Sequence, residues 1–123
     1  PVSLGTVQNI INQEGFPMFY DFWQNNSGGK FIINDKVAPI VWIEARNASE
    51  ANAIAESIGI IFDEGCECCG DRWGRVSERY AYEWPDASFL RMVVDDGFPH
   101  TYIYFLDGSV QKLWRGTKIL TKG

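Results

Sequence analysis

The apolar positions of the N-terminal third follow first a helical and then a strand-like pattern. Residues 4–14 place their apolar side chains on one helical face, and Pro17 lies just beyond the end. The aromatic run at 18–23 predicts a strand. The polar, glycine-containing segment 24–29 predicts a turn, and we expect residues 30–34 to return as the hairpin partner of that strand.

The middle of the chain predicts a strand, a helix and a second strand. Residues 40–43 are short, β-branched and apolar throughout, as expected for a strand in the centre of a sheet. Asn47 and Glu50 form a capping box, and Gly59 marks the end of the helix that follows. Residues 60–62 are expected to form the next strand. The apolar face of the helix is rich in alanine, which allows close packing on a sheet: Ala48, Ala51, Ile54, Ala55 and Ile58.

The C-terminal half predicts further short strands and one tight turn. The expected strands are 73–82 at a sheet edge, 89–94, 101–106 and 109–115, with a loop at 83–88. Asp107 and Gly108 predict the hairpin turn between the last two strands. The whole chain, residues 1–123, is therefore predicted to be a single small α+β domain, mostly antiparallel sheet with one or two helices packed on one face.

Composition supports an ordered domain and narrows the choice of partners. Of the 123 residues, 46% are hydrophobic and 15% aromatic, which is enough for a core. Sixteen acidic and eleven basic residues give a net charge of −5, which repels phosphate backbones, so we do not expect general nucleic-acid binding. The chain has no long apolar run and no secretory pattern at its start. We therefore expect no membrane association and a cytosolic location.

Three cysteines lie within four positions, at Cys66, Cys68 and Cys69. One interpretation is a zinc site, in which His100, a nearby carboxylate or a second chain completes the four ligands that zinc prefers. The other is a turn with buried, reduced thiols, because cysteine packs well as a small apolar residue. A cofactor is thus either absent or zinc.

Other chemistry is less well supported by the pattern. Arg72 and Arg75 are positioned to lower the pKa of a neighbouring thiol, but the two-residue spacing of redox cysteines is missing. His100 is the only histidine, so a cysteine–histidine enzyme would depend on it alone. The sequence contains no catalytic signature, and we do not expect an enzyme.

The aromatic residues suggest a binding surface. Tyr102 and Tyr104 fall on one face of a predicted strand, and tyrosine and tryptophan are frequent in interfaces. Trp73, Arg72 and Arg75 are the other candidate binding residues. The alternative is that these rings fill the core.

Two stretches resemble a known group of proteins. They are residues 41–76, which contain the motif Cys66-x-Cys68-Cys69-Gly70-Asp71-Arg72-Trp73, and the hairpin 104–110. Both are similar to a family of small uncharacterised proteins of tailed bacteriophages, including T4-like phages and cyanophages. The similarity covers roughly the last two-thirds of the chain and implies expression in the cytoplasm of an infected bacterium. It implies no catalytic residue, substrate or cofactor.

The expected function is therefore that of a non-enzymatic phage accessory protein. It would act by binding in the host cytoplasm, either inhibiting a host protein or sequestering a small ligand such as a defence signal. One alternative is a virion or assembly component, which could form a homo-oligomer. Another is a small structural protein that binds zinc.

Overall fold

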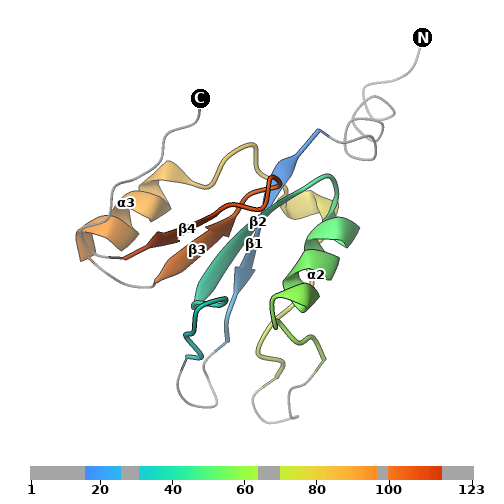
Figure 1. Cartoon of the computed structure of the whole chain (residues 1–123), viewed down its shortest axis with the longest axis horizontal. Helices are drawn as coiled ribbons and strands as arrows, with labels where there is room; N and C mark the ends of the chain where they lie inside the picture. Colours follow the sequence, from blue (N-terminus) through green and yellow to red (C-terminus); the bar gives the residue numbers. More distant parts are fainter. Residues whose placement is uncertain (1–15, 26–30, 64–69, 97–99, 115–123) are drawn as a thin grey trace.

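The computed structural model describes residues 16–25, 31–63, 70–96 and 100–114. These residues form a four-stranded sheet and two α-helices (Figure 1). The helix expected at residues 4–14 and the three cysteines lie outside the described residues.

The sheet has the strand order β1-β2-β3-β4, so the order along the chain is also the order in space. Its strands are β1 (Met18–Trp23), β2 (Ile40–Ala45), β3 (Thr101–Tyr104) and β4 (Val110–Leu113). β1 pairs antiparallel with β2, β2 pairs parallel with β3, and β3 pairs antiparallel with β4. The predicted α+β class with a mostly antiparallel sheet is confirmed, as is the central position of β2.

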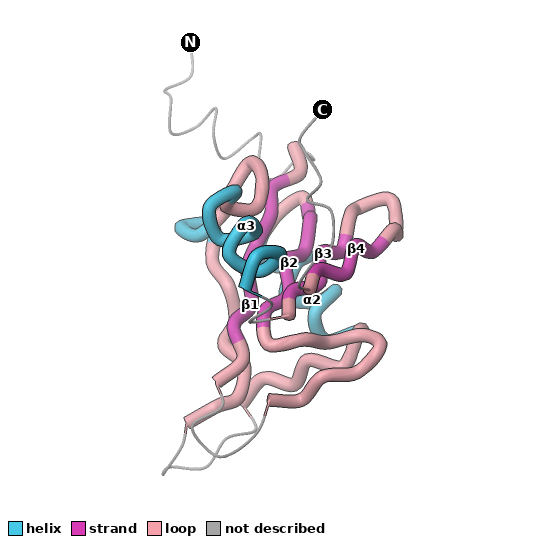
Figure 2. Tube along the Cα trace, turned by 90° about the vertical axis from the view of Figure 1, so that its left-hand side faces the viewer, coloured by secondary structure: helices cyan, strands magenta, loops and turns pink. Residues whose placement is uncertain are grey.

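The two helices cover opposite faces of this sheet. α2 (Ala48–Ser57) and α3 (Ala87–Asp96) both lie in the long connection between β2 and β3. Alternate residues of the strands contribute to two separate clusters of buried side chains, one packed with α2 and one with α3. In Figure 2, α3 lies in front of the sheet and α2 behind it. Each face thus carries one helix, so the expectation that the helices pack on one face was wrong, because the residue 89–94 segment expected as a strand is the helix that covers the second face. Neither described helix is long and apolar enough to cross a membrane.

The helix α2 forms where the sequence predicts it, because both ends are well capped. At its start the Asn47 side chain accepts a hydrogen bond from the backbone N–H of Glu50 (2.8 Å), and the Glu50 carboxylate accepts one from the backbone N–H of Arg46 (2.9 Å). At its end, Gly59 has a φ of 104°, and the N–H of Ile60 donates to the carbonyl of Ala55 (3.0 Å).

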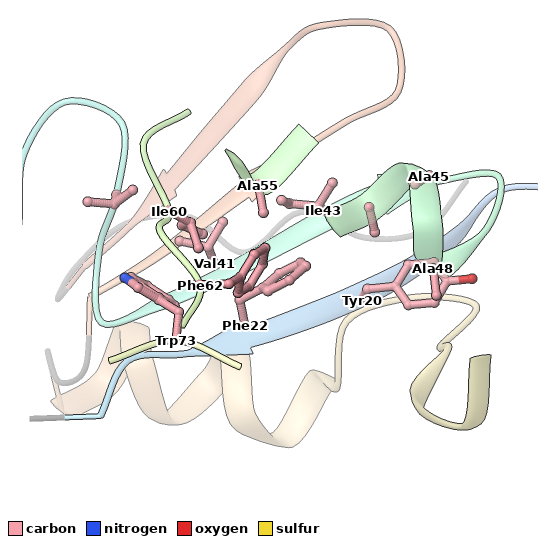
Figure 3. Close-up of a cluster of buried hydrophobic side chains, with 12 residues drawn as sticks. Tyr20, Phe22, Val41, Ile43, Ala45, Ala48, Ala55, Ile60, Phe62 and Trp73 are labelled. Carbon is pink, nitrogen blue, oxygen red and sulfur yellow. The ribbon is translucent and has the colours of Figure 1, made fainter. Parts of the chain in front are cut away.

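The core between α2 and the sheet depends on small residues of the helix. Ala51 and Ala55 are fully buried, which brings the helix close to Tyr20, Phe22 and Ile43 of the strands. Figure 3 shows this cluster, in which Phe62 lies beside Phe22 and Trp73 lies to one side, both from the loops that follow α2. The loops therefore complete the core that the helix alone would leave open.

Two of the expected strands are replaced by other pairing. Residues 31–34 are not the partner of β1, because β2 occupies that position. The side chain of the buried Gln24 instead accepts a hydrogen bond from the N–H of Ile32 (2.6 Å) and donates one to the carbonyl of Ile32 (3.0 Å). The expected strand at 60–62 was also wrong, since Ile60 belongs to the helix cap and Phe62 forms only an isolated bridge with Trp73.

Two further strand predictions were wrong in the second half of the chain. Residues 89–94 belong to α3, which buries Leu90 and Val93, three positions apart. Residues 73–82 contain a short 3₁₀ helix (Glu78–Tyr80) and make a single bridge to β1. The predicted turn at Gly108 is confirmed, with a φ of 94° there and a hydrogen bond from the N–H of Phe105 to the carbonyl of Ser109 (2.9 Å).

Candidate functional site

β1 is the first strand of the sheet, and its outer edge is only partly followed by the chain. Phe19 exchanges two backbone hydrogen bonds with Tyr82, of 2.6 and 2.8 Å, and the N–H of Asn25 donates to the carbonyl of Arg72 (2.7 Å). Backbone groups alternate in direction along an antiparallel strand, so Asp21 also directs its N–H and carbonyl outward. The segment 72–82 therefore follows β1 at its two ends.

Between these two contacts the segment is drawn away from β1 by α2. The side chain of Asn52 on α2 donates to the carbonyl of Val76 (3.0 Å) and accepts from its N–H (2.9 Å). The carboxylate of Glu78 accepts from the N–H of Ala48 at the start of α2 (2.6 Å) and from the hydroxyl of Tyr20 (2.8 Å). Both backbone groups of Val76 are thus used by a side chain, which explains why no edge strand forms here.

The separation leaves an open cavity of about 340 Å³, which we call the β1 hollow. This volume is at the lower end of the range for ligand sites, so it suits one or two side chains rather than a large cofactor. The hollow is lined by residues of β1 and of the displaced segment: Asp21, Trp23, Gly74, Arg75, Val76 and Tyr82.

One carboxylate and two exposed rings dominate the chemistry of the β1 hollow. The Trp23 ring is 54% exposed, and its indole N–H donates to Oδ2 of Asp21 (2.6 Å). Tyr82 is 39% exposed and packs edge-on against the buried ring of Trp42, with ring centroids 5.2 Å apart. A carboxylate beside aromatic faces attracts a positively charged group through its charge and through cation–π contact.

The arginine that lines the hollow has its charge compensated elsewhere. Arg75 forms an ion pair with Asp63 (2.5 Å), and its guanidinium lies 4.7 Å from the centre of the Phe62 ring. Neither of these partners lines the hollow. The uncompensated charge within the lining is therefore that of Asp21.

Of the five residues predicted to bind, Trp73 and Tyr102 are buried, Arg72 and Tyr104 are half-buried, and Arg75 is exposed. Trp73 is buried in the core, and Arg72 donates to Oε1 of Gln24 (3.0 Å), which links its segment to the end of β1. Tyr102 is 7% exposed and donates to the carbonyl of Asn34 (2.6 Å). Of the five predicted residues, Arg75 alone lines the β1 hollow.

Tyr104 is half-buried beside Tyr102, and its hydroxyl donates to the carbonyl of Lys36. Burial raises the pKa of Tyr104 to about 12, with smaller contributions from Tyr102 and Asp35. The bend at residues 34–36 thus covers the face that the two tyrosines share.

The predicted zinc ligands can be placed only in part. Cys66, Cys68 and Cys69 lie outside the described residues, and His100 is half-buried at the start of β3, where its carbonyl accepts from Ile40. Asp71, just after the cysteines, is held by Asn25 at the end of β1 (3.2 Å). β2 lies between β1 and β3, and Asp71 lies beyond the outer edge of β1, so Asp71 and His100 are about three strand spacings, or roughly 14 Å, apart. The described residues include no group of metal ligands, and zinc binding stays a prediction.

One feature of the sequence, the charged residue Asp21 within an aromatic strand, could have indicated the hollow. Asp21 is the one charged residue in the aromatic strand β1 and shares a face with Trp23. A charge within such a strand is costly unless it faces water or a partner. Tyr82, by contrast, is brought to the site only through long-range pairing.

A comparison with protein-family models matches residues 17–121 to a domain of unknown function (DUF7296). This range contains all four strands, both helices and every residue that lines the β1 hollow. No curated protein and no solved structure gives a significant match.

Proposed function

This chain belongs to the DUF7296 family, a domain of unknown function, and from that premise we propose that it is a non-enzymatic binding protein. Its ligand is a basic side chain of a partner protein, held in the β1 hollow. The observation that carries this proposal is the carboxylate of Asp21, which accepts a hydrogen bond from Trp23 and lines the same hollow as Tyr82.

The interactions available to a basic side chain are individually weak. A cation–π contact contributes about 0.5–2 kcal/mol, and an exposed ion pair about 0.2–1 kcal/mol. The two contacts together contribute at most about 3 kcal/mol, so a single arginine side chain would bind with a dissociation constant on the order of 10 mM or weaker. Useful affinity requires additional contacts from the partner around the hollow.

The charge of the whole chain favours the same class of partner. A net charge of −5 attracts basic proteins over a distance and repels nucleic acids. A phosphate ligand is less suitable for the hollow, because Arg75 is already paired with Asp63. The attraction is expected to weaken as salt is added.

The resemblance to small phage proteins suggests where this binding would take place. In an infected bacterium, a protein that holds a basic surface residue of a host protein would act as a host-directed inhibitor in the cytoplasm. Sequestration of a small defence signal would require that ligand to be cationic.

The test is an NMR titration of the full chain with acetyl-arginine-amide and with acetyl-citrulline-amide, its neutral isostere. We expect the arginine compound to shift the indole N–H resonance of Trp23, and the citrulline compound to have little effect. Asp21→Asn should abolish the shift, whereas Asp35→Asn, which removes the same charge beside β3, should preserve it. Equal shifts with both compounds would refute the proposal, as would an unchanged response in Asp21→Asn.

A further inference from the structure

We infer that the basic side chain belongs to an extended segment, which adds to the sheet as a short strand along the outer edge of β1. This inference rests on the proposed function and specifies the form of its ligand. Binding by strand addition uses backbone hydrogen bonds for affinity and alternate side chains for specificity.

The first support is the direction of the backbone at Asp21. Phe19 and Asn25 make their outward backbone bonds to Tyr82 and Arg72, so the residues of the same parity between them face the same way. The stretch from Phe19 to Asn25 is about 20 Å long at the usual rise of a strand. Asp21 lies within it, and no backbone hydrogen bond joins its outward side to another described residue.

The second support is that the protein holds its own chain off this edge. Segment 74–76 lines the far side of the hollow. The backbone N–H and carbonyl of Val76 are both bonded to the side chain of Asn52. The segment therefore does not compete through Val76 for the backbone of Asp21. An edge kept open in this way is available to a strand from another molecule.

The third support identifies the occupant by charge. In an antiparallel pair, the residue directly opposite Asp21 has its side chain on the same face, with Cβ atoms about 5 Å apart, so a lysine or arginine there meets the carboxylate. The same face carries the exposed ring of Trp23. A second copy of β1 is a poor occupant, because Met18–Trp23 contains no basic residue and symmetric pairing would oppose Asp21 to itself.

The experiment compares three peptides with the full chain, monitored by tryptophan fluorescence. They are acetyl-Val-Arg-Val-amide, which reaches only residues 20–22 when its arginine is opposite Asp21, the same peptide N-methylated on the arginine backbone nitrogen, and the citrulline peptide. We expect the parent peptide to bind about tenfold more tightly than propylguanidinium, which has the cation but no backbone, since two backbone hydrogen bonds are added. N-methylation should remove that gain, and hydrogen exchange of the Asp21 amide should slow in the parent complex.

The outcomes separate this inference from the proposed function. If the N-methylated peptide binds as tightly as its parent, the cation is held without strand pairing, and the inference is wrong while the proposed function stands. If the citrulline peptide binds as tightly as the arginine peptide, the proposed function itself fails. A dimer that native mass spectrometry detects, and that the parent peptide dissociates, would make a second copy the occupant and overturn the inference.

Discussion

The two hydrogen bonds between the Asn52 side chain and the backbone of Val76, which we call the clamp, should contribute measurably to the free energy of unfolding. Asn52→Ala removes the donor to the Val76 carbonyl and the acceptor of its N–H, and both groups are in a half-buried residue. Leaving such groups unsatisfied costs about 1–3 kcal/mol each when water is excluded, and less where water enters. Alanine regains about 0.5 kcal/mol through its higher helix propensity. The net loss should be about 1–2 kcal/mol in the free energy of unfolding.

The assay is urea unfolding followed by circular dichroism, with the midpoint compared at an unchanged slope. Glu56→Ala, at an exposed position on the same helix, is the matched control and should change stability by less than about 0.5 kcal/mol. Hydrogen exchange at the Val76 amide should also accelerate in Asn52→Ala. If Asn52→Ala is as silent as Glu56→Ala, the clamp does not hold the segment away from β1.

Three further predictions concern the core and the titratable groups. Ala55→Asp should prevent folding, because it buries a charge on the fully buried face of α2 at a cost of several kcal/mol, and circular dichroism would show the loss of structure. The pKa of Tyr104 is raised from 10.0 to about 12. Its contribution to stability is therefore complete below pH 10 and is lost as the pH rises to about 12. The urea midpoint of Tyr104→Phe should fall less over this pH range than that of the parent protein. Hydrogen bonds from Arg46 lower the pKa of Glu50. The contribution of Glu50 to stability is therefore present above the usual pKa near 4.5 and is lost as the pH falls through the lowered pKa. Urea unfolding should show Glu50→Gln to be less stable than the parent at neutral pH and equal to it in acid.

The parts of the fold that follow from local pattern were predicted from the sequence. β1, β2 and the C-terminal hairpin have short, aromatic or β-branched runs, and α2 has caps at both ends. α3 was predicted as a strand, because its β-branched apolar run is too short for the period to decide between strand and helix. The burial of Leu90 and Val93, three positions apart, indicates a helix, but this burial depends on the sheet face that they cover, which the local sequence does not show.

The features that sequence could not provide depend on distant contacts. Residues 73–82 carry a weak strand pattern, yet Asn52 takes the backbone bonds of Val76 from a position 24 residues away. The candidate site has the same origin, since Tyr82 reaches Asp21 and Trp23 only because it pairs with Phe19. Tyr102, a candidate binding residue, is covered by a bend that begins at Asn34, where the sequence pattern predicted the end of a hairpin strand.

Intermolecular nuclear Overhauser effects can locate a bound basic side chain on the protein. With acetyl-arginine-amide in excess, we predict contacts from its side-chain methylene protons to the rings of Trp23 and Tyr82, and none to Trp114, which is similarly exposed after β4. Contacts of that kind that disappear in Asp21→Asn would establish the β1 hollow as a cation site. Contacts to Trp114 in place of Trp23, or no contacts at all, would contradict it.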